Sequence, residues 1–291
     1  MAKAIVHDGV FHADDVCAVA MLKLFVTANV DVVRTRDEAI LAESLQDSEV
    51  WVLDVGKVHD PLMKNFDHHQ DKSPKAAVGR VAEFLAGEGI SYVEASMEDQ
   101  FVPFAARLIQ EMQQEVLDEV DLQDTGNSTC PETVFSISKA VSVFNCRNAY
   151  SPDQDIAFAE AVSVVERIFR NFVETKLEKY VLEEAVEKSF KECPGPLLIL
   201  GDAGLPWKEF AIKNMALVEE KNFTFAVFET GGSWRLQSMP DPSNPTVFSM
   251  KIKIGDEAKA FPVNIFVHPA GFIAGFTTEE DAVFAGMKLS S

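Results

Sequence analysis

The chain lacks long apolar runs, paired cysteines and any internal repeat or low-complexity segment. Charged residues interrupt its apolar stretches well before the ~18 residues that a transmembrane helix requires, so no membrane partner is expected. Its four cysteines form no Cys-x-x-Cys pair and stand at Cys17, Cys130, Cys146 and Cys193. A zinc knuckle or a redox motif is therefore not predicted, and reduced thiols are expected.

No targeting segment is expected either. Residues 1–7 lead straight into a β-branched run and leave no room for the apolar core of a signal peptide or for an Arg-rich transit peptide. The expectation is a cytoplasmic protein, with a prokaryotic cytoplasm as the simplest location.

Basic side chains are scarce. The net charge is −20, from 26 basic and 46 acidic residues, whereas nucleic-acid affinity normally comes from phosphate contacts to Lys and Arg. Seven of the basic residues nevertheless fall between positions 31 and 80, and local potential at a cleft steers a substrate more than net charge does. The balance favours a nucleotide or a short oligonucleotide over long duplex nucleic acid.

The first third of the chain alternates between short β-branched runs and amphipathic stretches. Strands are predicted near 4–7, 30–35 and 50–55, and helices near 13–25, 38–45 and 76–86. This βαβαβ order indicates an α/β fold in which helical crossovers join the strands of a parallel sheet.

Longer periodic segments follow. Residues 100–120 have apolar side chains at helical spacing and lead into an acidic stretch at 121–126. Residues 153–190 keep an apolar stripe over almost forty positions. A connecting helix is the favoured interpretation, and a dimerising coiled coil, hence a homo-oligomer, is the alternative.

The last hundred residues start with a buried-strand signal at 197–201. Strands are predicted at 223–229 and 233–239, joined by a Gly231-Gly232 hairpin turn, and a helix is predicted to start at Thr278. We therefore divide the chain into a first domain (1–150), a connecting helix (151–192) and a second, smaller α/β domain (193–291).

Three His/Asp clusters stand where predicted strands end. They are His7 with His12 and Asp14, Asp54 alone, and Asp67-His68-His69. Because ligands collect at the carboxyl edge of an open α/β sheet, the three clusters are expected to converge. Imidazoles and carboxylates together bind Mn²⁺ or similar ions, and two such ions can hold the attacking and leaving oxygens of a phosphate ester. The pattern predicts a dinuclear-metal phosphoesterase.

These motifs resemble the DHH phosphoesterase superfamily, and more closely its melanocyte-proliferating-gene (MYG) branch of exonucleases. Seven matches follow in family order and reach from Ile5 to about Ala282, so the resemblance covers nearly the whole chain. The matching segments are His7 to Asp14, Arg34 to Arg36, Asp54 to Gly56, Phe66 to Gln70, Leu205 to Lys208, Trp234 to Gln237 and Phe266 to Ile273.

The resemblance implies a parallel-sheet DHH domain that binds two Mn²⁺ or Mg²⁺ ions, followed by a substrate-binding domain. The implied metal ligands are His7, His12, Asp14, Asp54 as the bridging ligand, His68 and Asp124. Asp14 is favoured over Asp15, which is expected to face solvent or to cap the following helix. Asp124 is favoured over Asp121, which stays open as the alternative.

Other residues are expected to act on the substrate. His69 is the candidate for contacting the phosphate, and Asp67 for orienting a histidine. The predicted substrate-binding residues are Arg34, Arg36, Arg235, His268, Gly271 and Gly275. Either Arg34 or Arg36 is expected to face the phosphate cleft and the other solvent; His268 could instead be a core residue, and Trp207 and Trp234 could stack on a base or pack in the core.

One position departs from the branch pattern. After Gly271-Phe272-Ile273 the branch has Gly-Gly-His-His, and this chain has Ala274-Gly275-Phe276-Thr277. The implied activity is a metal-dependent 3′–5′ exonuclease on RNA or short oligonucleotides. The alternatives are a small-nucleotide phosphatase or pyrophosphatase, favoured by the acidic composition and the two missing histidines, and a non-catalytic metal- or nucleotide-binding protein.

Overall fold

The computed structural model describes residues 2–70, 73–129, 135–201, 204–241, 243–248 and 264–291, so Lys72 and Cys130 lie outside the described residues. The chain divides into two compact units, Met1–Leu177 and Glu178–Ser291. The division falls inside one long helix, α8 (Gln154–Glu192), which the sequence had suggested as a separate connecting segment at 151–192. The long helix itself is confirmed.

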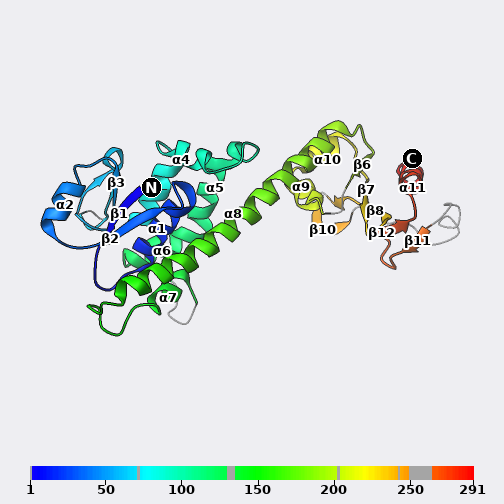
Figure 1. Ribbon diagram of the computed structural model, residues 1–291. Helices are drawn as coiled ribbons and strands as arrows, with labels where there is room; N and C mark the ends of the chain where they lie inside the picture. Colours follow the sequence, from blue (N-terminus) through cyan, green and yellow to red (C-terminus); the bar gives the residue numbers. More distant parts are fainter. Residues whose placement is uncertain (1, 71–72, 130–134, 202–203, 242, 249–263) are drawn as a thin grey trace. The chain divides into compact units, whose positions relative to one another are not determined.

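The first unit contains a five-stranded sheet in the order β2-β1-β3-β5-β4, of which Figure 1 labels β1, β2 and β3. Its strands are β1 (Ala2–Val6), β2 (Val30–Arg34), β3 (Val50–Leu53), β5 (Asn65–Phe66) and the short β4 (His59–Asp60). β1 pairs in parallel with β2 and β3, and β3 pairs in parallel with β5, whereas β4 is antiparallel. The predicted βαβαβ alternation and parallel sheet are confirmed.

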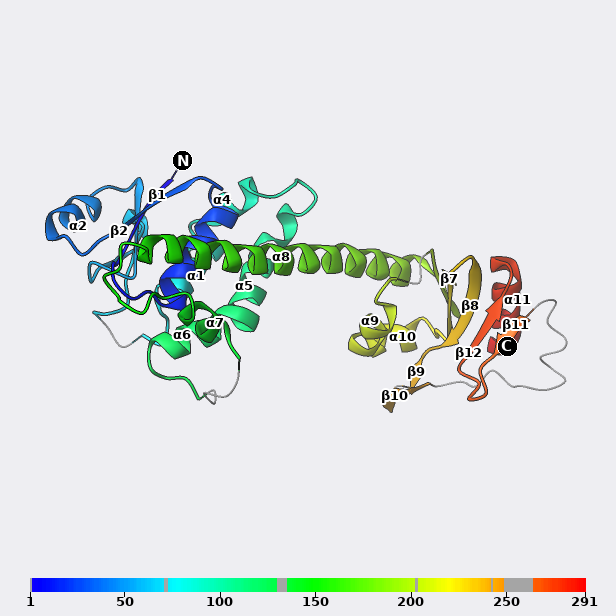
Figure 2. The same ribbon diagram turned by 60° about the horizontal axis from the view of Figure 1, so that its bottom comes forward.

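Helix α1 (Ala13–Phe25) is the centre of this unit. It contacts β2 and β3 as well as α3, α6 and α7, of which α6 and α7 are labelled beside it in Figure 2, and eleven of its thirteen residues are buried. A run such as Val16-Cys17-Ala18-Val19-Ala20 suits this position because it offers small apolar side chains on every face of the helix. On the other face of the sheet, Ile5, Val50 and Val52 pack near α2 (Glu38–Ser44).

The predicted helix at 100–120 is not one regular α-helix. A 3₁₀ turn (Val102–Phe104) precedes α5 (Ala105–Met112), a π-helical turn (Gln113–Leu117) follows, and α6 (Asp118–Asp124) continues to the acidic stretch. Pro103 lies in the 3₁₀ turn, where its missing N–H costs no helical hydrogen bond. The remaining helices are α3 (Ala77–Ala86), α4 (Ile90–Ala95) and α7 (Ile137–Ser142).

The second unit is built on a mixed sheet in the order β11-β12-β8-β7-β6. The strands are β6 (Leu197–Leu200), β7 (Phe225–Thr230), β8 (Ser233–Ser238), β11 (Asn264–Val267) and β12 (Ile273–Phe276). After β8 in the sequence, β9 (Pro240–Asp241) and β10 (Asn244–Phe248) form a separate two-stranded sheet. β6 and β7 are parallel, and the other sheet neighbours are antiparallel. Gly231 and Gly232 both have positive φ, as the predicted two-residue hairpin turn requires.

Helices cover both faces of this second sheet. α11 (Glu279–Ser290) packs on Leu197, Phe225 and Phe276, and begins at Thr278, whose hydroxyl accepts the Asp281 N–H as predicted. The end of α8 packs on the opposite face with α9 (Trp207–Lys213) and α10 (Met215–Glu220). Trp207 is 3% exposed in this core, so the core interpretation holds for it. No helix among the described residues has the length and apolar character needed to cross a bilayer.

Candidate metal centre

Three neighbouring parallel strands deliver the predicted clusters to one place. His7 follows β1, Asp54 follows β3, and His68 follows β5, and these strands lie next to one another in the sheet. Because the strands are parallel, their carboxyl ends share one edge. The predicted convergence of the three clusters is thus found in the structure.

Two helices complete the cluster. His12 precedes the first turn of α1, and Asp14 lies within that turn, fully buried. Asp124 is the last residue of α6. Its Oδ2 lies 2.9 Å from His68 Nε2, and its Oδ1 lies 3.5 Å from His12 Nδ1. The six predicted ligands therefore come together from three strand ends and two helix termini.

The side chains form overlapping groups whose ligand atoms lie within 4.8 Å of one another. The first group is His7, His12 and Asp54; the second is Asp14, Asp54, His68 and Asp124; a third joins Asp54 with His68 and His69. Asp54 belongs to every group. This arrangement suits two neighbouring cations that share one bridging carboxylate.

Buried polar atoms without hydrogen bonds support a metal-binding role. Both carboxylate oxygens of Asp54 and Nε2 of His68 are buried and make no hydrogen bond of acceptable geometry among the described residues. Their closest approaches are ion-pair contacts of His68 Nε2, which lies 2.9 Å from Asp124 Oδ2 and 3.2 Å from Asp54 Oδ1. Buried polar atoms are rarely left in this state because the lost hydration is costly. Divalent cations would satisfy all three atoms.

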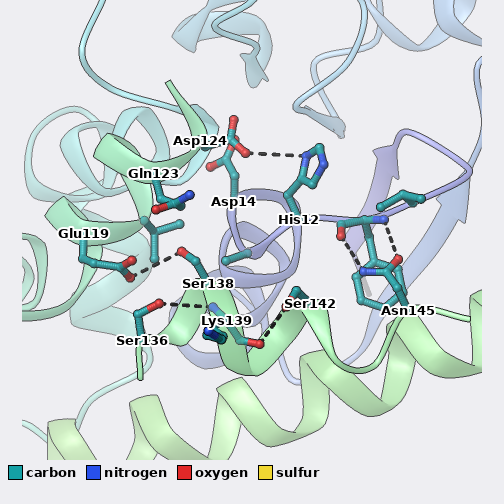
Figure 3. A pocket seen from close by; sticks show the side chains of 14 residues that line it. His12, Asp14, Glu119, Gln123, Asp124, Ser136, Ser138, Lys139, Ser142 and Asn145 are labelled. Carbon is teal, nitrogen blue, oxygen red and sulfur yellow. Dashed lines mark hydrogen bonds and ion pairs between the residues drawn. The ribbon is translucent and has the colours of Figure 1, made fainter. Parts of the chain in front are cut away.

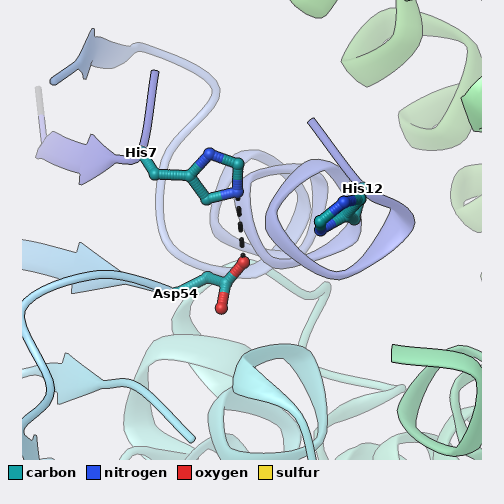
Figure 4. A group of neighbouring side chains, drawn as sticks. All are labelled: His7, His12 and Asp54. Carbon is teal, nitrogen blue, oxygen red and sulfur yellow. Dashed lines mark ion pairs between the residues drawn. The ribbon is translucent and has the colours of Figure 1, made fainter. Parts of the chain in front are cut away.

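His7 is oriented as a metal ligand should be. Its Nδ1 lies 3.0 Å from the Asp8 carbonyl oxygen, which accepts the Nδ1 proton in this arrangement. Its Nε2 then faces Asp54 Oδ2 at 3.4 Å (Figure 4). Metal-bound imidazoles usually donate their second N–H to such a carbonyl, which fixes both the tautomer and the ring orientation.

The shifted pKa values of the cluster also support a metal-binding role. Burial raises the pKa of Asp14 well above its usual value, and the charges of Asp54 and Asp124 raise it further. Burial lowers the pKa of His68, but Asp124 and Asp54 outweigh this and raise it to about 10. Burial likewise raises the pKa of Asp54, whereas His68 and His7 lower it below its usual range. Carboxylates crowded in this way need cationic partners, and bound metal ions would replace the imidazolium charges.

Asp15 does not face solvent, so that part of the expectation was wrong. It is fully buried; Oδ1 accepts hydrogen bonds from the backbone N–H groups of His12 and Val16, and Oδ2 lies 3.5 Å from His7 Nε2. Burial raises the pKa of Asp15 to about 7, although His7 opposes the shift. The carboxylate caps α1, the other part of the expectation, and it also lies behind the first ligand histidine.

Asp67 orients His69 rather than His68. Its Oδ1 lies 2.8 Å from both the backbone N and Nδ1 of His69, and its Oδ2 accepts the Lys57 N–H at 2.7 Å. Asp67 is buried, whereas the His69 side chain is 53% exposed. The fixed ring leaves Nε2 of His69 as the nitrogen available to a substrate.

Asp121, the alternative to Asp124, has another role in the structure. Its Oδ1 accepts hydrogen bonds from the N–H groups of Ala76 and Gly79, while Asp14 accepts those of Ala77 and Val78. Two buried carboxylates thus satisfy the four N–H groups at the start of α3, which a helix cannot satisfy internally. Asp121 belongs to none of the metal-ligand groups, so the geometry favours Asp124.

Neither predicted arginine contacts the ligand cluster. Arg34 has a side chain only 3% exposed; it lies over the rings of Phe11 and Phe158 and donates to the carbonyl of Gly9 and to Asp155. Arg36 is the solvent-facing member of the pair, and it donates to the Asp8 carboxylate and carbonyl. Arg34 therefore fastens the loop between the two ligand histidines instead of lining the cleft.

Two amide side chains that the sequence did not single out hold the same loop. Asn145 accepts the Phe11 N–H at 3.0 Å and donates to the Phe11 carbonyl at 2.8 Å. Gln154 donates to the Gly9 carbonyl and to Asn145 Oδ1. These residues lie about half the chain away from the loop, and no local sequence pattern marks them as partners.

A cavity of about 610 Å³ adjoins the cluster within the first unit (Figure 3). Three ligand candidates, His12, Asp14 and Asp124, form part of its wall. α6 and α7 supply polar side chains to the rest of the wall, namely Glu119, Gln123, Ser138, Lys139 and Ser142. A molecule bound to the cluster would therefore extend into this space.

The other predicted substrate residues lie in the second unit. Arg235 on β8 and Gly275 on β12 are cross-strand partners, and the Arg235 guanidinium lies over the Phe266 ring at 5.3 Å. A Cβ on Gly275 would come within 2.7 Å of that ring. His268 is half-buried; its Nδ1 accepts the Ala270 N–H and its backbone accepts that of Gly271. The structure thus gathers Arg235 and Gly275 on one sheet and places His268 and Gly271 in the β11–β12 connection.

Comparison with known proteins gives matches over most of this chain and most of each relative. A MYG1 exonuclease from mouse is 28% identical over 320 residues, covering 95% of this chain and 82% of the relative. A MYG1 protein from Chlamydia trachomatis is 26% identical over 293 residues, with coverages of 94% and 91%. Among solved structures, a pGpG-specific phosphodiesterase from Vibrio cholerae is 12% identical, with a TM-score of 0.34 and coverages of 99% and 97%.

The family assignment comes from a family model. That model, named for the MYG1 exonuclease and described as uncharacterised protein family UPF0160, matches residues 3–288. The match includes every strand end and helix terminus that supplies the cluster, as well as the second unit. The chain therefore belongs to the MYG1 exonuclease family (UPF0160).

Proposed function

We propose that this chain is a metal-dependent phosphodiesterase that removes nucleotides from the 3′ end of RNA or short oligonucleotides. The observation that carries the proposal is the sharing of Asp54 by the ligand groups around His7 and His68. The name of the mouse relative supports exonuclease action. The preference for RNA and the 3′–5′ direction rest on the resemblance to the MYG branch.

The proposed cofactor is a pair of Mn²⁺ or Mg²⁺ ions. The ligand groups contain imidazole nitrogens and carboxylate oxygens and no thiolate. This mixed set suits Mn²⁺ better than Mg²⁺, because Mg²⁺ prefers oxygen ligands alone. Such ions, when bound, supply the Lewis-acid chemistry that activates water and neutralises phosphate charge. His7, His12 and Asp54 would hold one ion, and Asp14, Asp54, His68 and Asp124 the other.

His69 is the proposed phosphate-contacting residue. Its ring is fixed by Asp67 at 2.8 Å and half-exposed, so Nε2 can reach a substrate oxygen without a change of rotamer. In the imidazolium form, with Nδ1–H donating to Asp67, this nitrogen donates a hydrogen bond that strengthens as charge develops on the phosphoryl oxygens, and such differential stabilisation lowers a reaction barrier.

The test is an end-labelled RNA assay. Purified protein with Mn²⁺ should convert a 5′-labelled single-stranded RNA into a ladder of progressively shorter labelled products, as 3′–5′ removal requires. A 3′-labelled RNA should release labelled mononucleotide at once. Absence of hydrolysis of all oligonucleotides and of simple phosphodiesters would refute the enzyme proposal, whereas immediate release of the 5′ label as a mononucleotide would overturn only the direction.

A second candidate is a phosphatase for a single small nucleotide. It is favoured by the net charge of −20, which weakens attraction to a long polyanion. Phosphate release from nucleoside monophosphates, with no shortening of RNA under the same conditions, would select this candidate.

A further inference from the structure

The cavity beside the ligand cluster has no assigned role. Its wall includes His12, Asp14 and Asp124 from the cluster, so it opens directly onto the place where a scissile phosphate would be held (Figure 3). Its volume of about 610 Å³ falls within the ~300–1,000 Å³ of pockets that take small organic ligands. The space is thus large enough for much more than a second phosphate group.

The wall chemistry argues against a polyphosphate. Apart from the ligand residue His12, the one basic side chain among the described lining residues is Lys139, and Glu119 brings a carboxylate into the same wall. Sites for several phosphate groups gather arginines, lysines or rows of backbone N–H groups, because each phosphate carries charge that must be neutralised. This wall neutralises little charge beyond the cluster itself.

The same wall matches the surface of a nucleoside. Hydroxyl and amide groups come from three serines and Gln123, and apolar surface comes from the start of α1, from the loop before it and from α6. The lining serines are Ser136, Ser138 and Ser142, and the apolar lining residues are Val10, Phe11, Ala13 and Val120. A nucleoside presents both kinds of surface, since a flat base accompanies a sugar with hydroxyl groups.

Glu119 provides the most specific feature of the wall. Its Oε2 lies 3.3 Å from the Ser138 hydroxyl, which donates to it (Figure 3). Its Oε1 is buried and has no hydrogen-bond partner among the described residues. An acceptor in this state calls for a donor such as a sugar hydroxyl or a base amino group, and it repels a phosphate.

We propose that this cavity binds the nucleoside of the nucleotide whose phosphate lies on the metal-ligand groups. The proposal rests on the proposed function, because it takes the cluster as the phosphate site. It adds that the substrate is recognised through its terminal nucleoside and that inorganic pyrophosphate is not the natural substrate.

The first test is direct binding to the wild-type protein. Calorimetric titration in Ca²⁺ should show 5′-AMP binding at least tenfold more tightly than inorganic phosphate and inorganic pyrophosphate, since the nucleoside adds contacts worth about that factor. Pyrophosphate or phosphate binding as tightly as the nucleotide would overturn the proposal. This test requires no turnover, so it is independent of the proposed reaction.

The second test fills the cavity. Ser138→Phe should lower kcat/KM on a dinucleotide at least tenfold, through KM, and leave the affinity for inorganic phosphate and the metal content within twofold of wild type, because inorganic phosphate carries no group that enters the cavity. Val143→Phe places a phenyl ring just after the same helix, at a side chain that is 76% exposed and outside the cavity wall, and it should leave both dinucleotide turnover and phosphate affinity unchanged. Equal losses of dinucleotide turnover and of phosphate affinity would refute the nucleoside role.

A gentler variant guards against misfolding. Glu119→Gln keeps the side-chain volume and should weaken 5′-AMP binding severalfold while inorganic phosphate binding stays unchanged or improves, because a repulsive charge is gone. Unchanged 5′-AMP affinity would contradict the assignment. If wild-type protein hydrolyses neither the dinucleotide nor a simple phosphodiester, the proposed function fails, and the binding comparisons still decide whether the cavity takes a nucleoside.

Discussion

Asp54 offers the sharpest test of the metal centre, because the variant Asp54→Asn changes its charge and almost nothing else. Asn and Asp have nearly the same volume, and both are tolerated in the left-handed backbone region that residue 54 occupies, with φ of 52°. The side chain is buried and belongs to every metal-ligand group. The substitution therefore removes one bridging charge without a steric or backbone cost.

The expected loss of function is large. Mutations of residues that merely support metal ligands cost about 10–100-fold in affinity or activity, and loss of a shared ligand should cost at least as much. We expect the variant to lose at least one metal equivalent and to turn over roughly a hundredfold or more slowly on a phosphodiester. Metal content by mass spectrometry after gel filtration and steady-state kinetics in Mn²⁺ measure both effects.

The metal-free variant should also be less stable at neutral pH. Burial raises the pKa of Asp54, but the two imidazoles outweigh it and hold this pKa below its usual value, so the stabilising contribution is complete near pH 7 and is lost only as the pH falls through the acid range. Its contacts with His68 and His7, at 3.2 and 3.4 Å, are partly offset by repulsion from Asp14. We expect a net cost of about 2 kcal/mol.

For the first unit, which ends at Leu177, such a cost corresponds to a Tm lower by roughly 4–8 °C. Thermal unfolding in chelator at pH 7 measures it. Asp60→Asn is the matched control, because Asp60 caps a 3₁₀ turn outside the cluster and Asn keeps that cap. Full metal content and normal turnover in Asp54→Asn would show that the cluster is structural, and the dinuclear interpretation would fall.

Three further variants test the groups that support the site. Arg34→Lys keeps the charge but loses the planar guanidinium that holds the loop between His7 and His12. The affinity for one of the two metal ions should therefore fall about tenfold in a Mn²⁺ titration, and unchanged affinity at both sites would contradict this role. Gly79→Ala would place a Cβ against the Asp121 carboxylate and should lower the free energy of unfolding by about 1–3 kcal/mol in urea titration; an unchanged midpoint would show that α3 can shift at no cost. Burial raises the pKa of Glu166, but the ion pair with Lys23 at 2.8 Å contributes to a net lowering. Glu166→Gln should therefore lower the free energy of unfolding by about 1 kcal/mol at pH 7, and by progressively less as the pH falls below the usual Glu range. A pH-independent difference would refute the ion-pair explanation.

The sequence by itself determined the first sheet and the composition of the cluster. The β-branched runs before His7 and Asp54 mark strands, and alternation with helical stretches makes those strands parallel. Parallel strands end at one edge, so the convergence of their terminal His and Asp residues followed from local patterns alone. The family resemblance, whose motifs lie in both units, was confirmed over residues 3–288.

The choice between Asp121 and Asp124 needed the tertiary structure. The two residues lie three positions apart on α6 and therefore share a helix face, so helical periodicity cannot separate them. Asp121 meets the N-terminus of α3, and Asp124 meets His68 and His12. Which carboxylate binds a helix and which can bind a metal depends on where α3 packs, and no local pattern encodes that.

Arg34 and Asp15 show the same limit for single side chains. Both are charged residues near predicted ligands. Their neighbours along the chain left Arg34 open between solvent and the cleft, and Asp15 open between solvent and a helix cap. In the structure Arg34 lies against Phe158, more than a hundred residues later in the chain, and the fully buried Asp15 lies near His7. The sequence determined which chemical groups come to the strand ends, because secondary structure is local; only the packing of distant helices decided which of them point into the site, because the direction of a side chain depends on the surface it meets.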